Sequence, residues 1–364
     1  MTSAPPDPTP APIARLLADF DAGRPAALAR AVSIVENHRP GFDALLAALH
    51  ARTGRAQRIG ITGPPGAGKS TLTTTLVAAL REAGQRVAVI AVDPTSPFTG
   101  GALLGDRIRM ERVALDPGVY IRSLATRGSL GGLSTATREV ADVIDAFGFD
   151  HILIETVGVG QSELDVARAA DTTVVVLVPE SGDSIQTLKA GLMEIADLFV
   201  VNKADRPGAD RVRHDIEVML GMRGGASYGN VPAHHGVDLA KLVNPARAAR
   251  KAAAEEDATH WTPPVLRTVA AQGEGVDELV SALARHRRYL AESGELGRRR
   301  RARLRERVVE VVEQKLRARL WRNDGTNAWV DARLPELEAG TTTPFAVADG
   351  LLARSADLLT RTGS

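Results

Sequence analysis

The sequence GPPGAGKS, at residues 63–70, decides the fold expected for this chain. It matches the pattern G-x-x-x-x-G-K-[ST], in which glycines let the backbone turn so that its N–H groups converge on phosphate oxygens. An apolar run typical of a buried strand precedes it at 58–62, and a helical pattern follows at 69–83. The N-terminus of that helix adds partial positive charge. The sequence therefore predicts a nucleoside triphosphate site lined by Gly63, Pro64, Pro65, Gly66, Ala67, Gly68, Lys69, Ser70 and Thr71.

The metal ion that accompanies a triphosphate needs oxygen ligands beside this loop. The Lys69 ammonium is expected to reach the β- and γ-phosphates, and the Ser70 hydroxyl to ligate Mg²⁺. Two carboxylates follow predicted strands, Asp93 in AVDP and Glu155 in HILIETVGVGQ. Either can hold Mg²⁺ through water, and capping of the strand end is the alternative for both. The N–H of Gly158 can bond the γ-phosphate, as in a loop whose shape depends on the bound nucleotide.

Strand-like and helical patterns alternate along the middle of the chain. Apolar runs at 58–62, 86–92, 151–155, 173–178, 198–202 and 265–270 predict buried strands. Helical patterns occur between and after them, at 69–83, 133–146, 163–170, 184–195, 209–220 and 276–291. This alternation is typical of an α/β fold, a doubly wound and mostly parallel sheet of the P-loop NTPase kind.

The sequence NKAD, at residues 202–205, follows one of these strands at the edge where open α/β sheets bind ligands. The Asp205 carboxylate can accept hydrogen bonds from the N1–H and the 2-amino group of guanine, whereas adenine has no such donor pair. Asn202 can bond the other edge of the base, and the stem of Lys203 can lie against the ring. We therefore expect guanine to be selected.

Two further stretches suit mobile loops near the phosphates. Residues 96–112 are rich in glycine and then in charge, and they carry Asp106 and Arg109. Arg109 can stabilise the transition state or be an ordinary surface cation, and the sequence favours neither. Residues 179–191 carry Asp183, Gln186 and Lys189.

Composition shifts predict four parts. Residues 1–12 form a Pro-rich disordered tail, 13–55 an N-terminal helical segment, and 56–292 the P-loop domain, in which 222–260 reads as an insertion. Residues 293–364 form a C-terminal helical arm, because apolar residues recur at helical spacing through 298–320.

Composition also excludes several classes of protein. Hydrophobic residues make up 44% and charged residues 24%, which is typical of a globular chain. A net charge of +1 provides no overall field for nucleic acid or anionic lipid. There is no cysteine, which excludes disulfides and thiolate chemistry, and no apolar run approaches the ~20 residues of a membrane span. We expect a cytoplasmic protein with no membrane partner.

Beyond these signals, several blocks of sequence resemble the MeaB/ArgK family of GTPases. The blocks are GPPGAGKST, AVDPTSPFTGGALLGDRIRM, RGSLGGLS, ETVGVGQSE, VPESGDSIQTLKAG, VNKAD and WTPPV, which together cover residues 58 to 290. The resemblance implies a slow GTPase that serves as a chaperone of an adenosylcobalamin-dependent acyl-CoA mutase, methylmalonyl-CoA mutase in the first place. It would gate loading of the cobalamin cofactor, protect the mutase from inactivation, and form a homodimer through the C-terminal arm.

Carried over residue by residue, the resemblance also assigns roles. Asp93, Asp106 and Glu155 would serve the metal and the attacking water, beside Lys69 and Ser70 at the phosphates. Asp183, Gln186 and Lys189 would form a switch that responds to the mutase. Taken together with the reading of the residues themselves, the expected catalytic set is Lys69, Asp106, Arg109, Glu155 and Lys189.

Three alternatives remain. A P-loop kinase would need an acceptor pocket with a base, whereas NKAD and a glycine-bearing switch favour water as acceptor and guanine as base. An RNA-associated GTPase is supported only by the arginine-rich run at 298–307, which no aromatic platform accompanies. A metal-insertion GTPase would need a Cys or His cluster, and His234–His235 is the single pair of adjacent histidines.

Overall fold

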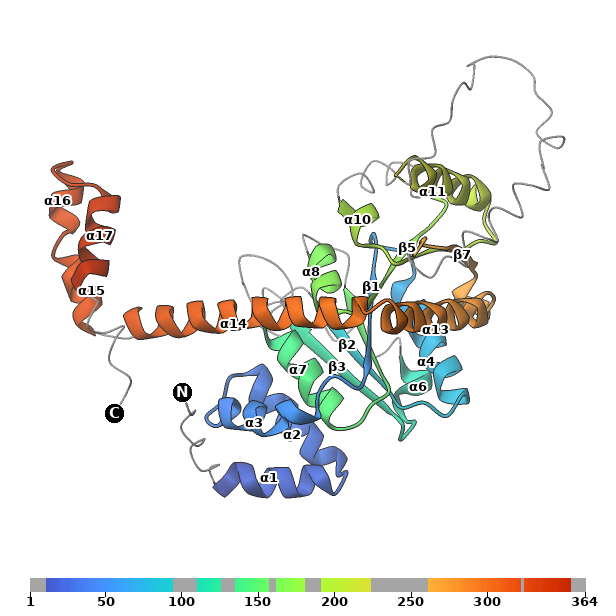
Figure 1. Cartoon of the computed structure of the whole chain (residues 1–364), viewed down its shortest axis with the longest axis horizontal. Helices are drawn as coiled ribbons and strands as arrows, with labels where there is room; N and C mark the ends of the chain where they lie inside the picture. The colour runs from blue at the N-terminus through green and yellow to red at the C-terminus, as the bar shows by residue number, and fades with distance from the viewer. Residues whose placement is uncertain are drawn as a thin grey trace, which may run out of the picture. The chain divides into compact units, whose positions relative to one another are not determined.

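The computed structural model describes residues 11–93, 110–125, 135–156, 162–180, 191–223, 261–321 and 324–354. Residues 57–268 contribute a seven-stranded sheet with helices around it (Figure 1), and its strand order is β3-β2-β4-β1-β5-β6-β7. Its neighbouring strands pair in parallel. The strands are β1 (Gln57–Thr62), β2 (Val87–Asp93), β3 (Val119–Ala125), β4 (His151–Thr156), β5 (Thr172–Leu177), β6 (Leu198–Asn202) and β7 (Val265–Thr268). The expected α/β fold with a mostly parallel sheet is confirmed.

Helices cover both faces of this sheet, which is why its inner strands are mostly apolar on both faces. On β2, Val87 and Val89 pack into one core cluster with α4 (Lys69–Glu82) and α13 (Val276–Glu292). Ala88 and Ile90 point the other way, into a second cluster. That second cluster contains α1 (Ala11–Asp21), α2 (Pro25–Glu36), α3 (Phe42–Leu49), α7 (Thr135–Ala146) and α8 (Ser162–Ala169).

A third cluster covers one face of β5 and β6. Val175 and Phe199 contribute to it from the sheet. Its helices are α10 (Met193–Ile195) and α11 (Ala209–Arg223). The remaining short elements of this part of the chain are η1 (His50–Arg52), α6 (Glu111–Ala114) and η4 (Ala270–Gln272).

β3 is a strand that the hydrophobic pattern did not predict. It lies at the edge of the sheet, pairs with β2 alone, and is mostly half-buried. Its sequence, VYIRSLA, places polar residues in the middle, and Arg122 forms an ion pair with Glu36 of α2. The β-formers Val119, Tyr120 and Ile121 directly after Pro-Gly were the available signal.

α11 continues to Arg223, two residues into the stretch that the sequence predicts to be an insertion from 222. Near the end of the predicted C-terminal arm lies α17 (Pro344–Arg354), and residues beyond 354 lie outside the described part. None of the described helices is long and apolar enough to cross a membrane.

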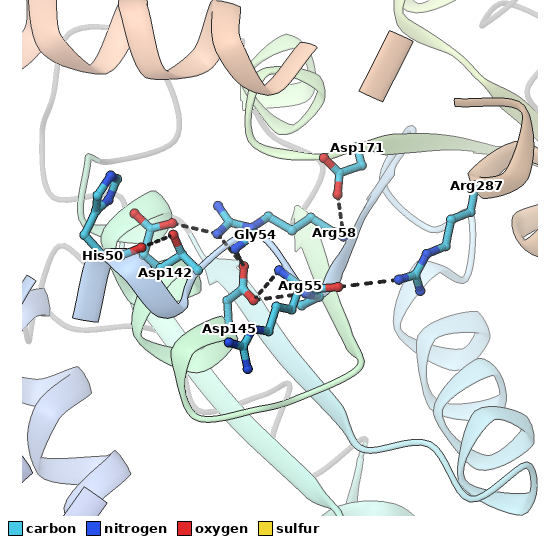
Figure 2. A network of polar contacts seen from close by, with 10 residues as sticks. His50, Gly54, Arg55, Arg58, Asp142, Asp145, Asp171 and Arg287 are labelled. Carbon is cyan, nitrogen blue, oxygen red and sulfur yellow. Dashed lines mark hydrogen bonds and ion pairs between the residues drawn. The ribbon is translucent and has the colours of Figure 1, made fainter. Parts of the chain in front are cut away.

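Asp145, in the last turn of α7, fixes the chain that leads into β1. Its carboxylate accepts hydrogen bonds from three consecutive backbone N–H groups, those of Gly54 (2.7 Å), Arg55 (3.1 Å) and Ala56 (3.0 Å) (Figure 2). The Asp145 side chain has no exposed surface. Donors that converge in this way satisfy a buried carboxylate and rigidify the backbone that supplies them.

Arg58, the second residue of β1, extends this network. Its Nη2 lies 2.6 Å from an oxygen of Asp142 and 3.2 Å from one of Asp145, and its backbone N–H bonds Asp171 (Figure 2). Burial lowers the pKa of Arg58, but the three carboxylates more than offset that effect and raise it above its usual value. The start of β1 is therefore held by groups from α7 and from the turn before β5.

Trp261 anchors the chain where it returns to the sheet before β7. Its Nε1 donates to the backbone oxygen of Asp197 (2.8 Å), and its ring lies 4.6 Å from that of His286 and 5.5 Å from that of Tyr289. His286 is fully buried, and its Nδ1 lies 2.9 Å from Oγ1 of Thr172. These contacts join Trp261 to α13 and to the starts of β5 and β6.

Contacts within the chain divide it into two compact units, 1–296 and 297–364. The N-terminal helices belong to the first unit, since they share a core with α7. In the second, α15 (Asp324–Asp331) packs against α17, where Val347 and Leu351 are buried. α16 (Leu334–Glu338) lies between them in sequence. The long helix α14 (Glu295–Trp321) begins at the end of the first unit, and none of its described side chains is buried.

Candidate nucleotide site

The loop at residues 63–70 joins β1 to α4 and has the backbone that its glycines allow. Gly63, Gly66 and Gly68 have φ values of 139°, 75° and 83°, which side chains other than glycine rarely adopt. A Cβ on Gly63 would lie 2.1 Å from the backbone oxygen of Val176, and one on Gly68 would lie 2.5 Å from Nδ2 of Asn202. The loop is thus packed against β5 and the end of β6, and it turns directly into the first turn of α4.

Lys69 lies at the start of α4 with its ammonium directed back into the loop. Nζ donates to the backbone oxygens of Gly63 (2.8 Å) and Pro64 (3.0 Å), and the residue is only 6% exposed. No acidic residue occupies the first turn of α4. The lysine charge and the helix N-terminus therefore act in the same direction, and both favour an anion at this loop.

Ser70 and Glu155, two of the predicted metal ligands, contact each other beside the loop. The Ser70 hydroxyl donates a 2.6 Å hydrogen bond to Oε1 of Glu155, which is 1% exposed near the end of β4. β4 pairs with both β1 and β2, and Glu155 is in register with Ile61 and with Ala91. Asp93 ends β2 at the same edge of the sheet; its backbone is described and its side chain is not.

Asn202, at the end of β6, connects this strand to the phosphate loop and to the end of β7. Its Nδ2 donates to the backbone oxygen of Ala67 (2.9 Å), and its Oδ1 accepts from Thr268 Oγ1 (3.0 Å) and from the N–H of Ala270 (3.1 Å). The side chain is 2% exposed. Both acceptor sites of Oδ1 are used, so a contact with the base would have to come from the second hydrogen of Nδ2. Asn202 is thus first a structural link from the phosphate loop to the turn after β7.

The turn at residues 203–206 lies against the phosphate loop and presents Asp205 to solvent. Lys203 adopts a left-handed conformation (φ of 55°), and its Nζ donates to the backbone oxygen of Gly66 (2.9 Å). The N–H of Arg206 bonds the oxygen of Lys203 (3.0 Å), which closes the turn, and the N–H of Ala204 bonds Thr268 (3.0 Å). Asp205 is exposed at the tip of this turn.

Several predicted site residues lie outside the described residues. They are Asp106, Arg109, Gly158, Asp183, Gln186 and Lys189, and most of the presumed insertion, 224–260, with His234–His235, lies there too. Conversely, Thr268 and Ala270 were not predicted as parts of the site. Their signal was positional, since Thr268 ends β7 in register with Asn202 and Ala270 follows two residues later.

Comparison with known proteins agrees with this geometry. The sequence model of the family described as methylmalonyl-CoA mutase-associated GTPase MeaB matches residues 28–325. A protein of Pyrococcus horikoshii whose name includes the word GTPase is 46% identical over 301 residues, which cover 83% of this chain and 86% of that one. The GTPase ArgK of Escherichia coli is 34% identical over 327 residues, covering 88% and 90%.

A solved structure shares the fold across nearly the whole chain. It is titled as an LAO/AO transport system kinase and superposes with a TM-score of 0.61 at 27% identity, covering 96% of this chain and 98% of the other. The phosphate loop and the 203–206 turn packed against it are in keeping with these similarities. This chain belongs to the MeaB family and is a GTPase that binds guanine nucleotides.

Proposed function

We propose that this GTPase is a Mg²⁺-dependent chaperone of an adenosylcobalamin-dependent acyl-CoA mutase, methylmalonyl-CoA mutase in the first place. It would gate the loading of the cobalamin cofactor and protect the mutase from inactivation. The observation that carries the proposal is the match of residues 28–325 to a family described as mutase-associated.

The residues at the phosphate loop support the metal-dependent part of the proposal. Ser70 and Glu155 offer two hard oxygen donors 2.6 Å apart, the chemistry that Mg²⁺ prefers. They would hold the ion, with Asp93 as a further candidate at the neighbouring strand end. When bound, Mg²⁺ would neutralise charge on the β- and γ-phosphate oxygens.

The protein's own part in hydrolysis is positioning and electrostatic stabilisation. The backbone N–H groups at the start of α4 and the Lys69 ammonium would bind the phosphates and stabilise charge on the leaving oxygen. Glu155 would orient water near the γ-phosphate, and Asp205 would hold the base. Asp106, Arg109, Gly158 and Lys189 are proposed to complete the site from the segments around it.

The mutase would act through residues 181–190, which contain the proposed switch Asp183, Gln186 and Lys189. Two described segments flank this stretch. Glu180, three residues after β5, precedes it, and Leu192 and Met193 follow it as members of the third core cluster. Both flanks lie close in sequence to nucleotide-site strands, so a partner bound there could change GTP turnover without touching the phosphates.

Phosphate transfer by a kinase is the second candidate function, because one solved structure of similar fold is titled as a kinase. Hydrolysis and phosphate transfer differ in the acceptor, which is water in one case and a hydroxyl or guanidinium group in the other. The test measures release of inorganic phosphate from GTP and from ATP, by the chain alone and with a B12-dependent acyl-CoA mutase. GTP-selective release that rises with the mutase supports the chaperone. GTP hydrolysis that no such mutase changes removes the proposed partner. Transfer of the γ-phosphate to an acceptor without release of inorganic phosphate supports the kinase.

A further inference from the structure

Two cations flank the base-selecting carboxylate of Asp205 in the 203–206 turn, and each is held by another group. Lys203 donates through Nζ to the backbone oxygen of Gly66 (2.9 Å). Arg206 donates through Nη1 to Oε1 of Glu180, with which it forms an ion pair. Among the residues that the structure describes, no ion pair joins Asp205 to either cation or to any other.

The Glu180–Arg206 pair is supported by contacts around it. Glu180 follows β5 by three residues, whereas Arg206 belongs to the turn after β6, so the pair bridges two loops at one sheet edge. A Cβ on Gly208 would lie 3.7 Å from Cβ of Pro179, which puts these loops in van der Waals range. The hydrogen bond from Arg206 holds the pKa of Glu180 below its usual value, and the one to Glu180 raises the pKa of Arg206.

Arg206 would otherwise be a competitor for the carboxylate beside it. The backbone N–H of Arg206 donates to the oxygen of Lys203 and closes the turn. The side chains of Asp205 and Arg206 therefore start from adjacent positions of a backbone that this bond fixes. A guanidinium that paired with Asp205 would occupy the oxygens that guanine needs for its N1–H and 2-amino donors. The hydrogen bond and charge of Glu180 are the main causes of the raised pKa of Arg206, and the charge of Asp205 adds to them in the same direction.

We propose that Glu180 is a positioning residue for guanine selection, because it holds the Arg206 guanidinium away from the carboxylate of Asp205. The inference rests on the proposed role of Asp205. It gives Glu180, a residue outside the NKAD sequence, a part in choosing the base.

The test measures binding of GDP and ADP to the full chain in four forms: wild type, Glu180→Ala, Arg206→Ala and the double variant. Removing Glu180 frees Arg206 to pair with Asp205, so GDP affinity falls about two- to fivefold, the scale of an exposed ion pair. ADP affinity stays unchanged, since adenine offers no donor pair to the carboxylate. Arg206→Ala leaves GDP affinity intact, and the double variant regains the wild-type value.

A matched control is Glu217→Ala, which removes the same charge from an exposed Arg213–Glu217 pair of 3.0 Å on α11 and leaves GDP binding unchanged. Salt supplies a second readout, because screening at about 1 M weakens an Arg206–Asp205 pair and shrinks the defect of Glu180→Ala. Equal losses in both single variants with no recovery in the double variant would overturn the inference alone. A wild-type chain without preference for GDP over ADP would overturn the proposed guanine site as well.

Discussion

The hydroxyl of Ser70 donates a 2.6 Å hydrogen bond to Oε1 of Glu155, and this bond joins the first turn of α4 to the end of β4. The two residues are 85 positions apart in the chain, and both were expected to serve one metal ion. A bond this short to a carboxylate is charge-assisted, so the two oxygens are held at fixed positions next to the phosphate loop.

Replacement of Ser70 by Ala is expected to lower GTP turnover at least tenfold, about 1.4 kcal/mol of lost stabilisation, and to abolish the effect of Mg²⁺ on GTP affinity. Ser70→Thr keeps the hydroxyl and should retain activity. Thr75→Ala, which removes a hydroxyl bonded to Thr71 further along α4, is the matched control. The measurement is GTP affinity as a function of Mg²⁺ concentration. If the GTP affinity of Ser70→Ala still depends on Mg²⁺, the proposed metal site is contradicted.

Asn202 and Asp205 should differ in what their loss costs. Asn202→Ala leaves the N–H of Ala270 and the hydroxyl of Thr268 without their acceptor, so it lowers the free energy of unfolding by about 1–3 kcal/mol. It also weakens binding of GDP and ADP alike, since the phosphate loop loses its link to Ala67. Asp205→Ala, at an exposed tip, leaves stability unchanged and removes the preference for guanine. Urea denaturation and nucleotide binding measure both, and equal unfolding energies for the two variants refute the distinction.

Asp145→Ala is expected to be the most destabilising of the charge-removing variants. It leaves three backbone N–H groups without an acceptor and Arg58 short of one of its carboxylates, at a cost of about 3–5 kcal/mol. Asp142→Ala is the control, because the Asp142 side chain pairs with the same Arg58 but is 38% exposed. It should cost about 1 kcal/mol or less. Unfolding in urea compares the two, and similar values would contradict the role given to the buried carboxylate.

His151, at the start of β4, predicts a pH dependence of stability. Burial, and next the charge of Arg287, lower its pKa to about 4 from 6.5, whereas Asp150 opposes the shift. Between these values the unfolded chain binds a proton that the folded chain does not, so the free energy of unfolding falls as the pH drops from 6.5 towards 4. The decrease due to this group is about 3 kcal/mol at most. His151→Leu should flatten the dependence, and parallel curves for wild type and variant would contradict it.

The homodimer implied by the resemblance to the MeaB/ArgK family can be tested on the long helix α14. Leu304, Val308, Val312 and Leu316 recur every four residues along it and are 40–63% exposed. A second copy of the chain would cover this stripe. Val308→Asp with Leu316→Asp should therefore shift the mass in solution from dimer to monomer, while Gln314→Asp, on the opposite side of the helix, does not. Light scattering coupled to size exclusion gives the mass, and a dimer that survives the double variant removes α14 from the interface.

The sequence predicted the parts of the fold whose causes are local. Continuous apolar strands and the glycines of 63–70 were visible in short windows, and six of the seven strands followed from them. β3 was not predicted because an edge strand does not need apolar residues in its middle. Its Arg122 pairs with Glu36, which lies 86 residues earlier in the chain. The bonds of Asn202 to Ala67 and Thr268 span 135 and 66 residues, so no local pattern could show that its oxygen was already in use. The network of Asp145 with residues 54–56 was hidden for the same reason.

The anchoring of Trp261 has a practical consequence for protein engineering. The chain leaves α11 at Arg223 and is fixed again at Trp261 by Asp197, His286 and Tyr289, and β6 and β7 pair directly with each other. Both ends of the 224–260 stretch are therefore attached to elements whose positions are fixed by other contacts, α11 on one side and Trp261 on the other. A fluorophore or an affinity handle placed in that stretch would be inserted between these two attachment points, outside the described β6–β7 pairing.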